Sequence, residues 1–265
     1  VRRFATPRND TGAREGQVRL RAVAQAPATN IVEVRHASMA FGTGAARHAV
    51  FEDISFEVAQ GEFLCIVGSS GCGKTTLLRQ IAGLQKPTSG AVVFDGAPVT
   101  RPTLDKAIVF QDYSKALLPW RTVAGNIALS LEVAGTPKEQ IKAEVDDLLL
   151  KMGLLPAAGR YPAQLSGGMQ QRVQIARSLA QRPKIILMDE PFGALDAITR
   201  QVLQDELQTL ARERNMTVVF ITHDLEEALY LGDSVIVLAS NPGRIVRQIH
   251  VDLPRPRRQL ETREN

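Results

Sequence analysis

The chain has 265 residues, of which 44 % are hydrophobic and 23 % charged, a balance that supports a sizeable folded core. Its formal net charge is +4 at pH 7, but residues 1–30 contain six Arg against Asp10 and Glu15, so this segment carries the whole excess. The neutral remainder argues against a general nucleic-acid-binding role. Two cysteines, Cys65 and Cys72, are too few for a disulfide framework, and no stretch approaches the ~20 apolar residues of a membrane span. We therefore expect a protein of the cytosol.

Residues 1–30 are basic and polar, contain Pro and Gly, and have no sustained periodicity, so we expect them to be a disordered tail. They lack the apolar run of a secretory signal peptide. A solvated leader and an electrostatic contact with anionic lipid remain alternative interpretations of this tail. The segment 251–265 is short and rich in Arg and Pro, which favours a flexible C-terminal tail.

Residues 31–250 alternate between strand and helix patterns and are expected to form one domain. Apolar runs predict strands at 31–41, 54–68, 90–96, 106–112, 184–190, 217–224, 234–240 and 245–253. Helical patterns cover 73–84, 136–152, 169–181, 200–214 and 225–231. This order predicts an α/β fold with a mainly parallel sheet covered by helices on both faces. The helix-rich stretch of about 112–165 interrupts the alternation, so we expect it to be a helical subdomain inserted into the core.

A glycine-rich segment, GSSGCGKT, matches the phosphate-loop pattern G-x-x-x-x-G-K-[ST] and lies between an apolar strand and a helix. Backbone N–H groups of such a loop and the helix dipole bind phosphate, the lysine reaches the β- and γ-phosphates, and the threonine hydroxyl is suited to Mg²⁺. A small space-filling side chain is the favoured interpretation of the cysteine inside it. The predicted nucleotide-binding residues of this segment are Gly68, Ser69, Ser70, Gly71, Cys72, Gly73, Lys74, Thr75 and Thr76.

Two acidic residues follow the apolar strand IILM. Asp189, at the strand end, is suited to hold Mg²⁺ through water, and Glu190, pointing to the other face, is suited to act as a general base that activates water. Adjacent carboxylates at the end of a buried strand are costly without a cation or proton between them. His223 ends another apolar strand and is either a contact for the γ-phosphate or a structural histidine.

A second glycine turn, SGG at Ser166, Gly167 and Gly168, opens the helix MQQRVQIARSLAQ. Ser166 has the chemistry of a helix N-cap, and exposed N–H groups with the helix dipole form a second anion site. Taken alone, the pattern favours a simple capped helix. The closeness of this turn to Asp189 in the sequence favours the phosphate interpretation.

The segment LSGGMQQR resembles the signature motif of ABC-transporter ATPases. The resemblance continues in chain order through GSSGCGKT, Gln111 in VFQDYS, LSGG, LMDEP, GALD at Gly193–Asp196, and His223, and it covers residues 31–250. It implies a P-loop NTPase fold with an N-terminal antiparallel β part beside the mainly parallel sheet. The fifth signature position, Met169, departs from the commonest LSGGQ form, and phosphate contact rests on the preceding Ser and Gly.

The resemblance also implies the partners and cofactors, which are ATP, Mg²⁺ and a second copy of the chain. In a head-to-tail dimer, Ser166–Gly168 of one copy would bind the γ-phosphate of ATP held by the other copy's phosphate loop, and GALD would lie across the interface. Gln111 would link Mg²⁺ and the attacking water to the helical subdomain, and Phe41 would stack on the adenine, where the family often has Tyr. The catalytic residues would be Glu190, His223 and Gln111, and Thr75, Gln111 and Asp189 would hold the metal.

A finer resemblance, to the nitrate/sulfonate/taurine branch of bacterial importers, comes from LLPW at Leu117–Trp120 and from SNPGRIV at 240–246. The apolar cluster around Trp120 is suited to receive a helix of a partner, and the alternative is that Trp120 belongs to the subdomain core. The implied function is ATP-driven import of a small organic or inorganic anion through a separate transmembrane permease. The chain would be peripheral on the cytoplasmic face of the inner membrane, supplied indirectly by an external solute-binding protein.

Two other functions fit the same motifs. The first is the ATPase of an exporter or lipid-extraction system, against which LLPW argues. The second is a soluble ABC ATPase that acts on nucleic acid or ribosomes, against which the single phosphate loop and the neutral body argue.

Overall fold

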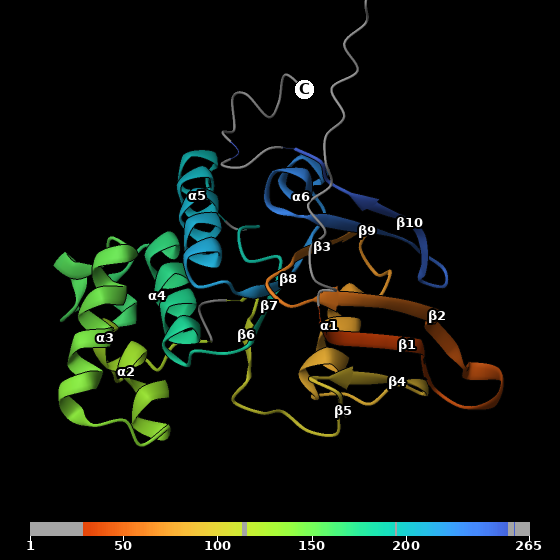
Figure 1. Cartoon of the computed structure of the whole chain (residues 1–265), viewed down its shortest axis with the longest axis horizontal. Helices are drawn as coiled ribbons and strands as arrows, with labels where there is room; N and C mark the ends of the chain where they lie inside the picture. The colour runs from red at the N-terminus through yellow and green to blue at the C-terminus, as the bar shows by residue number, and fades with distance from the viewer. Residues whose placement is uncertain (1–28, 113–115, 194, 254–256, 258–265) are drawn as a thin grey trace, which may run out of the picture.

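A computed structural model describes residues 29–112, 116–193, 195–253 and 257. Two β-sheets and a group of helices lie in layers across the molecule (Figure 1). Nearly all of the basic segment 1–30 lies outside the described residues, so its expected disorder stays a prediction.

The first sheet is antiparallel and has four strands in the order β2-β1-β4-β5. These are β1 (Asn30–Phe41), β2 (His48–Ala59), β4 (Ser89–Phe94) and the short β5 (Ala97–Pro98), with the 3₁₀ turn η1 (Gly44–Ala46) joining the first two. β1 pairs with both β2 and β4 in antiparallel register. The expected N-terminal antiparallel β part is therefore present.

The second sheet has six strands in the order β10-β9-β3-β8-β7-β6. Its strands are β3 (Phe63–Gly68), β6 (Lys106–Val109), β7 (Ile185–Asp189), β8 (Thr217–Thr222), β9 (Ser234–Ala239) and β10 (Arg244–His250). The pairs β3–β8, β3–β9, β6–β7 and β7–β8 are parallel, whereas β10 runs antiparallel along β9 at the edge. The prediction of a mainly parallel α/β core is confirmed.

Several predicted elements differ from the observed ones at their ends, and one predicted strand is in fact two strands. The continuous strand expected at 54–68 is two strands in different sheets, β2 and β3, because the chain turns between them. Gly61 has φ +78, a left-handed conformation that favours glycine, and a Cβ there would lie 2.5 Å from the side-chain oxygen of Asn215. The turn takes the chain from the antiparallel sheet into the parallel one.

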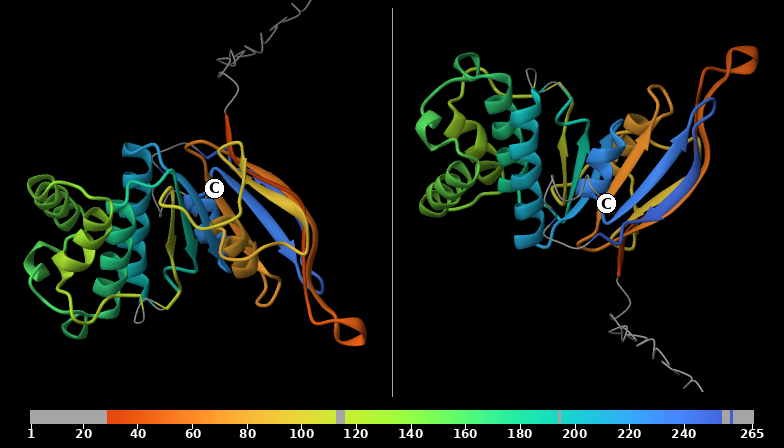
Figure 2. Two further views of the ribbon diagram at one scale, coloured as in Figure 1. Left: turned by 90° about the horizontal axis from the view of Figure 1, so that it is seen from below. Right: turned by 90° about the horizontal axis from the view of Figure 1, so that it is seen from above.

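Both faces of the parallel sheet are buried, which explains the continuous apolar strands. On β3, Phe63, Cys65 and Val67 belong to the core on the side of α4 (Gly167–Ala180), α5 (Ala197–Glu213) and α6 (Leu225–Leu231). The alternating Leu64 and Ile66 belong to a second core with α1 (Lys74–Ala82) and the antiparallel sheet. Figure 2 shows α1 enclosed between the two sheets.

The helical group consists of α2 (Val123–Val133) and α3 (Lys138–Lys151), followed by the 3₁₀ turns η3 (Leu155–Ala157) and η4 (Pro162–Gln164). It packs outside α4 and away from the antiparallel sheet (Figure 1). This group falls within the helical subdomain expected at about 112–165. No helix in the described part of the chain is long and apolar enough to cross a bilayer.

The described part of the C-terminal segment packs against the domain. The Arg257 guanidinium is buried and donates hydrogen bonds to the carbonyl oxygens of Tyr230 (3.1 Å) and Gly232 (2.5 Å) at the end of α6. Residues 254–256 and 258–265 lie outside the described residues, so the expected flexible tail is a prediction only for them.

Candidate nucleotide-binding site

The phosphate loop connects the end of β3 to the start of α1, as the sequence predicts. Gly71 (φ +82) and Gly73 (φ +95) both adopt left-handed conformations that glycine reaches without strain. Gly73 is the N-cap of α1, and no side chain caps this helix end. The first N–H groups of α1 are therefore available to a ligand.

The other helices around the site differ in this respect. Each of four helices begins with a side chain that accepts a hydrogen bond from its own first turn: Thr122 for α2, Ser166 for α4, Asp196 for α5 and Asp224 for α6. The uncapped start of α1, reached through a glycine loop at the end of a parallel strand, is the arrangement that binds phosphate groups. The loop residues thus fit a nucleotide.

The conformation of the loop is supported by close packing at two glycines, Gly73 inside the loop and Gly243 beside it. A Cβ on Gly73 would lie 2.7 Å from the Phe51 ring, and a Cβ on Gly243 would lie 2.2 Å from the Cys72 carbonyl oxygen. Phe51 is fully buried and forms a β-bridge with Gly243. The turn between β9 and β10 is thereby packed directly against the phosphate loop. Sequence reasoning missed both supporting residues, Phe51 and Gly243, as parts of the site.

Lys74 extends back along the loop. Its side chain is only 6 % exposed, and Nζ donates hydrogen bonds to the carbonyl oxygens of Gly68 (2.7 Å) and Ser69 (3.1 Å). The Glu190 Oε1 atom lies 3.8 Å from the same Nζ. A buried ammonium group held at the mouth of the loop supplies positive charge where an anion would bind.

Thr75 and Asp189 form a pair of oxygen ligands beside the loop. The Thr75 hydroxyl donates a hydrogen bond of 3.1 Å to Asp189 Oδ1. Burial raises the pKa of Asp189 above its ordinary value of 3.8, the hydrogen bond from Thr75 opposes this, and the Glu190 carboxylate raises the pKa further. A buried carboxylate that lacks a full counter-charge, next to a hydroxyl, fits a hard divalent cation such as Mg²⁺.

Glu190 is the residue on which three predicted site residues converge. Its Oε2 atom accepts a hydrogen bond of 3.5 Å from Gln111 Nε2 and lies 3.2 Å from His223 Nδ1, while Oε1 faces Lys74. These contacts join the ends of β6, β7 and β8 to the phosphate loop. The carboxylates, the lysine, the glutamine and the histidine therefore occupy one place in the fold.

The backbone at Glu190 differs from the expected strand geometry. β7 ends at Asp189, and Glu190 has φ +43, a left-handed conformation that is costly for a non-glycine residue. Its N–H donates to the Ile221 carbonyl oxygen at 3.0 Å, which holds the strained residue at the sheet edge. The turn brings the Glu190 side chain towards Lys74 instead of leaving it on the opposite face of a regular strand.

The SGG turn is not brought to the phosphate loop of its own chain. Among the described residues, no hydrogen bond or ion pair joins Ser166–Gly168 to residues 68–76. Ser166 instead accepts a hydrogen bond of 3.3 Å from Met169 N, and a Cβ on Gly168 would lie 2.8 Å from the Thr199 side chain of α5. Ser166, the N-cap of α4, is exposed, so this helix end faces solvent in the single chain.

Two further predicted contact residues lie at the surface. Phe41, at the end of β1, is 51 % exposed, and its aromatic face is free of the core. Trp120 is 71 % exposed, so the alternative that it belongs to the subdomain core is wrong, whereas Leu117 nearby is buried. Ala194, inside the GALD segment, lies outside the described residues.

Comparison with known proteins agrees with this geometry. Residues 51–193, more than half of the chain, match the ABC transporter family. An uncharacterised ABC transporter ATP-binding protein of Methanocaldococcus jannaschii is 49 % identical over 227 residues, covering 85 % of this chain and 84 % of the relative. The chain belongs to the ABC transporter family, as one of its ATP-binding, ATP-hydrolysing cassettes.

Two named relatives come from Synechococcus elongatus. The nitrate import ATP-binding protein NrtD is 45 % identical, with 82 % of this chain and 80 % of the relative covered. The bicarbonate transport ATP-binding protein CmpC is 48 % identical over 83 % of this chain, which spans only 33 % of that relative's length.

A solved structure has the same fold. It is a dimeric post-hydrolysis state of an ATP-binding cassette bound to ADP and Pi, with a TM-score of 0.73 and 31 % sequence identity, covering 84 % of this chain and 100 % of that chain.

The packing behind the phosphate loop predicts the effect of adding one methyl group. In Gly243→Ala the new Cβ meets the Cys72 carbonyl oxygen, which displaces the loop, so we expect ATP to bind about tenfold more weakly, a change of ~1.4 kcal/mol. Calorimetric titration with ATP measures this change. Gly159→Ala is the matched control, because a Cβ there meets nothing within 4 Å and affinity should be unchanged. Unaltered ATP affinity in Gly243→Ala would show that the turn does not position the loop.

The raised pKa of Asp189 predicts a pH effect on the nucleotide-free chain. The folded chain binds this proton more tightly than the unfolded chain, so the carboxyl costs stability progressively as pH rises above 3.8, by about 1.4 kcal/mol per unit of pKa shift. As pH rises from about 4 through the raised pKa of Asp189, Asp189→Asn should therefore gain thermal stability relative to the wild type. Melting curves across this range test the prediction, with the exposed Asp146→Asn as control. Parallel pH profiles for Asp189→Asn and wild type would contradict it.

Proposed function

We propose that this chain is the ATP-hydrolysing subunit of an importer for a small anion and that it acts as a dimer beneath a separate transmembrane permease. The observation that carries the proposal is the convergence of Gln111, His223 and Lys74 on the Glu190 carboxylate beside an uncapped helix N-terminus. A general base must lie within hydrogen-bond reach of the groups that orient its water and of the phosphate to be attacked. This cluster meets that requirement.

Each residue then has a defined task. Lys74 and the N–H groups at the start of α1 bind the β- and γ-phosphates, and Glu190 accepts the proton of the attacking water. Gln111 and His223, which contact the Glu190 carboxylate, orient this base and the γ-phosphate. Mg²⁺, when bound, neutralises charge on the β- and γ-phosphate oxygens, and Thr75 and Asp189 would hold it with Gln111. Phe41 would stack on the adenine.

The dimer rests on the position of the SGG turn. Ser166 is exposed at the start of α4 and makes no contact with the phosphate loop of its own chain among the described residues, yet this helix end retains free N–H groups and the positive end of the dipole. In a head-to-tail dimer this turn would complete the site on the partner copy. The solved relative that holds ADP and Pi is described as dimeric, which supports this arrangement.

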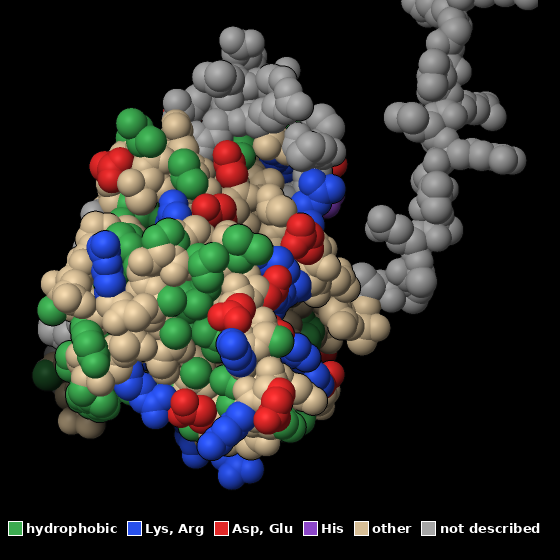
Figure 3. Space-filling view, turned by 90° about the vertical axis from the view of Figure 1, so that its left-hand side faces the viewer, with side chains coloured by type: hydrophobic (Ala, Val, Ile, Leu, Met, Phe, Trp, Pro, Cys, Tyr) green, Lys and Arg blue, Asp and Glu red, His purple; other side chains and the backbone are tan. Residues whose placement is uncertain are grey.

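The contact with the permease is expected on the helical group. Trp120, just before α2, is exposed while Leu117 is buried, and exposed apolar side chains of the helical group include Val133, Leu150 and Leu155. Figure 3 shows the face of the molecule on this side, where apolar side chains gather among charged ones. An exposed tryptophan in such a setting is a typical anchor for a partner helix.

The anion class is supported by the named relatives. One is a nitrate import protein and another a bicarbonate transport protein, and both align with most of this chain. An external solute-binding protein would deliver the anion to the permease. Because the ATPase does not touch the cargo on this proposal, nothing in its site selects among these anions.

Replacing the general base tests the catalytic assignment. Glu190→Gln keeps the size of the side chain and one acceptor oxygen but no longer accepts a proton, so turnover should fall by about 10²-fold or more while ATP binding is retained. The nucleotide-bound dimer should then accumulate, which size-exclusion chromatography with ATP detects. The exposed Glu139→Gln should behave as wild type. Undiminished ATPase activity in Glu190→Gln would remove the basis of the assignment.

The permease contact predicts a separation of activities at Trp120. Trp120→Ala should leave the ATPase activity of the isolated chain unchanged and weaken co-purification with its permease, by about tenfold or more for an anchor residue. Val246→Ala, an exposed apolar side chain on β10, is the matched control. Full co-purification with Trp120→Ala would exclude this surface as the contact.

A further inference from the structure

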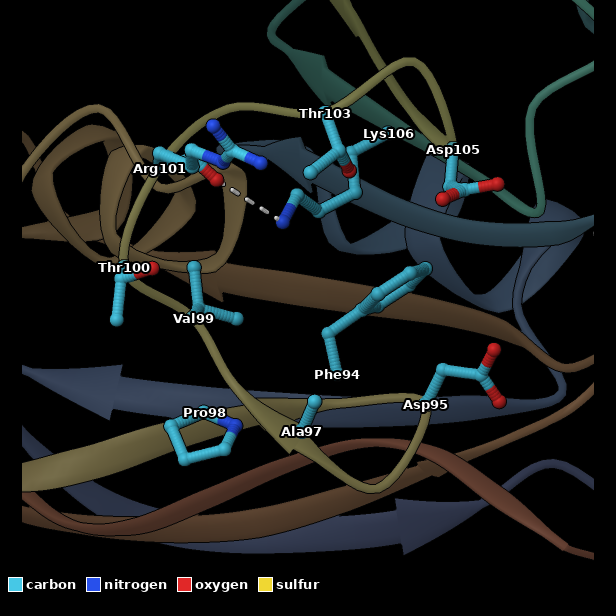
Figure 4. A pocket seen from close by; sticks show the side chains of 10 residues that line it. All are labelled: Phe94, Asp95, Ala97, Pro98, Val99, Thr100, Arg101, Thr103, Asp105 and Lys106. Atoms are coloured by element: carbon cyan, nitrogen blue, oxygen red, sulfur yellow. Dashed lines mark hydrogen bonds between the residues drawn. The ribbon is translucent and has the colours of Figure 1, made fainter.

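A small cavity lies between the β4–β5 hairpin and the start of β6, at the end of α1 remote from the phosphate loop. Its volume is about 260 Å³, and Figure 4 shows the ten side chains around it. The cavity adjoins the end of α1 directly, because a Cβ on the C-cap Gly83 would lie 2.4 Å from the Arg101 carbonyl oxygen. It has no part in the nucleotide site described above.

The wall of this cavity contains a buried lysine. Lys106 is 8 % exposed, and its Nζ makes one long hydrogen bond of 3.4 Å to the Arg101 carbonyl oxygen. The same Nζ lies 5.0 Å from the centre of the Phe94 ring. An ammonium group has three N–H donors, so most of the donor capacity of Lys106 is unused by the described residues. No ion pair of Lys106 is present in that part of the chain.

This environment is unfavourable for a charged amine without a further partner. Burial lowers the pKa of Lys106 below 10.5, and the charge of Asp105 only partly offsets the effect. A buried cation is stabilised when an anion and hydrogen-bond acceptors surround it. The neighbouring Phe94 ring supplies a weaker, cation–π contact. The cavity therefore favours a negatively charged occupant near Nζ.

The charges around the cavity are separated. Figure 4 shows the terminal nitrogen atoms of Arg101 and Lys106 at one end and the carboxylates of Asp95 and Asp105 at the other. Asp95 forms an exposed ion pair with Lys184, whose Nζ donates a hydrogen bond of 2.5 Å to Asp95 Oδ2. The hydroxyl of Thr103 lies on the Lys106 side (Figure 4). The end formed by Arg101 and Lys106 is thus the positively charged end.

Between the two charged ends the cavity wall is mainly apolar. Phe94 forms the middle of this wall, and Ala97, Pro98 and Val99 complete it (Figure 4). A cavity of this volume is smaller than the pockets of about 300–1,000 Å³ that bind drug-sized ligands. It fits a molecule of a few heavy atoms, with one acidic group and a short carbon chain.

We propose that this cavity binds a small organic anion, whose sulfonate or carboxylate group contacts Lys106 and Arg101 and whose short apolar part lies against Phe94. Arg101 offers a planar guanidinium that pairs with either acidic group, and Lys106 adds a buried charge. The site is separate from the ATP site, and the inference does not depend on the proposed transport function. Lys106 opens β6, the strand that leads to Gln111, so an occupant here contacts an element of the nucleotide site at its far end.

The test is calorimetric titration of the full chain with ethanesulfonate, with saturating ADP and Mg²⁺ present so that the phosphate loop is occupied. We expect binding to the wild type and a loss of affinity of about tenfold or more in Lys106→Met, which removes one charge-assisted contact. Lys106→Met preserves the buried shape, and replacing a buried charge by an apolar group is often neutral for stability. Arg101→Ala, in an exposed loop, should also weaken binding and serves if Lys106→Met folds poorly.

The exposed Lys142→Met is the control and should bind as wild type. The same titration with propionate tests the carboxylate form, and nitrate and sulfate test an inorganic anion. Absence of binding by both ethanesulfonate and propionate would overturn the proposal. Binding that is unchanged in both Lys106→Met and Arg101→Ala would overturn it as well, as would Lys106-dependent binding restricted to nitrate or sulfate.

Discussion

The constraint on which this structure depends is the open N-terminus of α1. The chain must keep several backbone N–H groups unpaired at the end of a buried strand, a state that is unfavourable unless an anion occupies it. Neighbouring parts of the fold maintain this conformation by close packing, with Phe51 beneath Gly73 and Gly243 against the Cys72 carbonyl. Neither contact leaves space for a side chain. The antiparallel sheet and the edge strand β10 therefore serve the phosphate loop as well as their own core.

The backbone strain of the site and its charged side chains are concentrated at one residue, Glu190. Glu190 is held in a left-handed conformation at the end of β7, with its carboxylate among Lys74, Gln111 and His223. Backbone strain at such a position is paid for by the surrounding sheet, and it places a side chain where a regular strand would not. The same chain holds its SGG turn away from this cluster, as a capped and exposed helix end. Each copy therefore contains both halves of the site, the phosphate-loop cluster and the SGG turn, but holds them apart. In the proposed dimer, each half meets the other half from the partner copy.

The parts of the fold and of the site that the sequence predicts are those that depend on local motifs. The phosphate loop, the Asp189–Glu190 pair and the Ser166 cap each depend on a few adjacent residues whose chemistry defines their conformation, and strand ends of a parallel sheet bring Gln111, Glu190 and His223 to one edge. The support by Phe51 and Gly243, the break at Gly61 and the φ of Glu190 depend on contacts between distant segments, which no local pattern encodes. The exposure of Trp120 could not be predicted from the sequence either, because a core and an interface have the same apolar sequence pattern.

In the proposed dimer each catalytic site is assembled from two copies of the chain, and mixing two inactive variants tests this assembly. Lys74→Ala removes the phosphate-loop charge, and Ser166→Arg blocks the signature turn, so each variant alone should be inactive. In a mixed dimer, one site combines the intact Lys74 of one copy with the intact Ser166 of the other. An equal mixture should recover ATPase activity, up to about a quarter of wild type, since half of the dimers are mixed and each has one intact site of two. A mixture as inactive as its two components would show that the sites are not shared between copies.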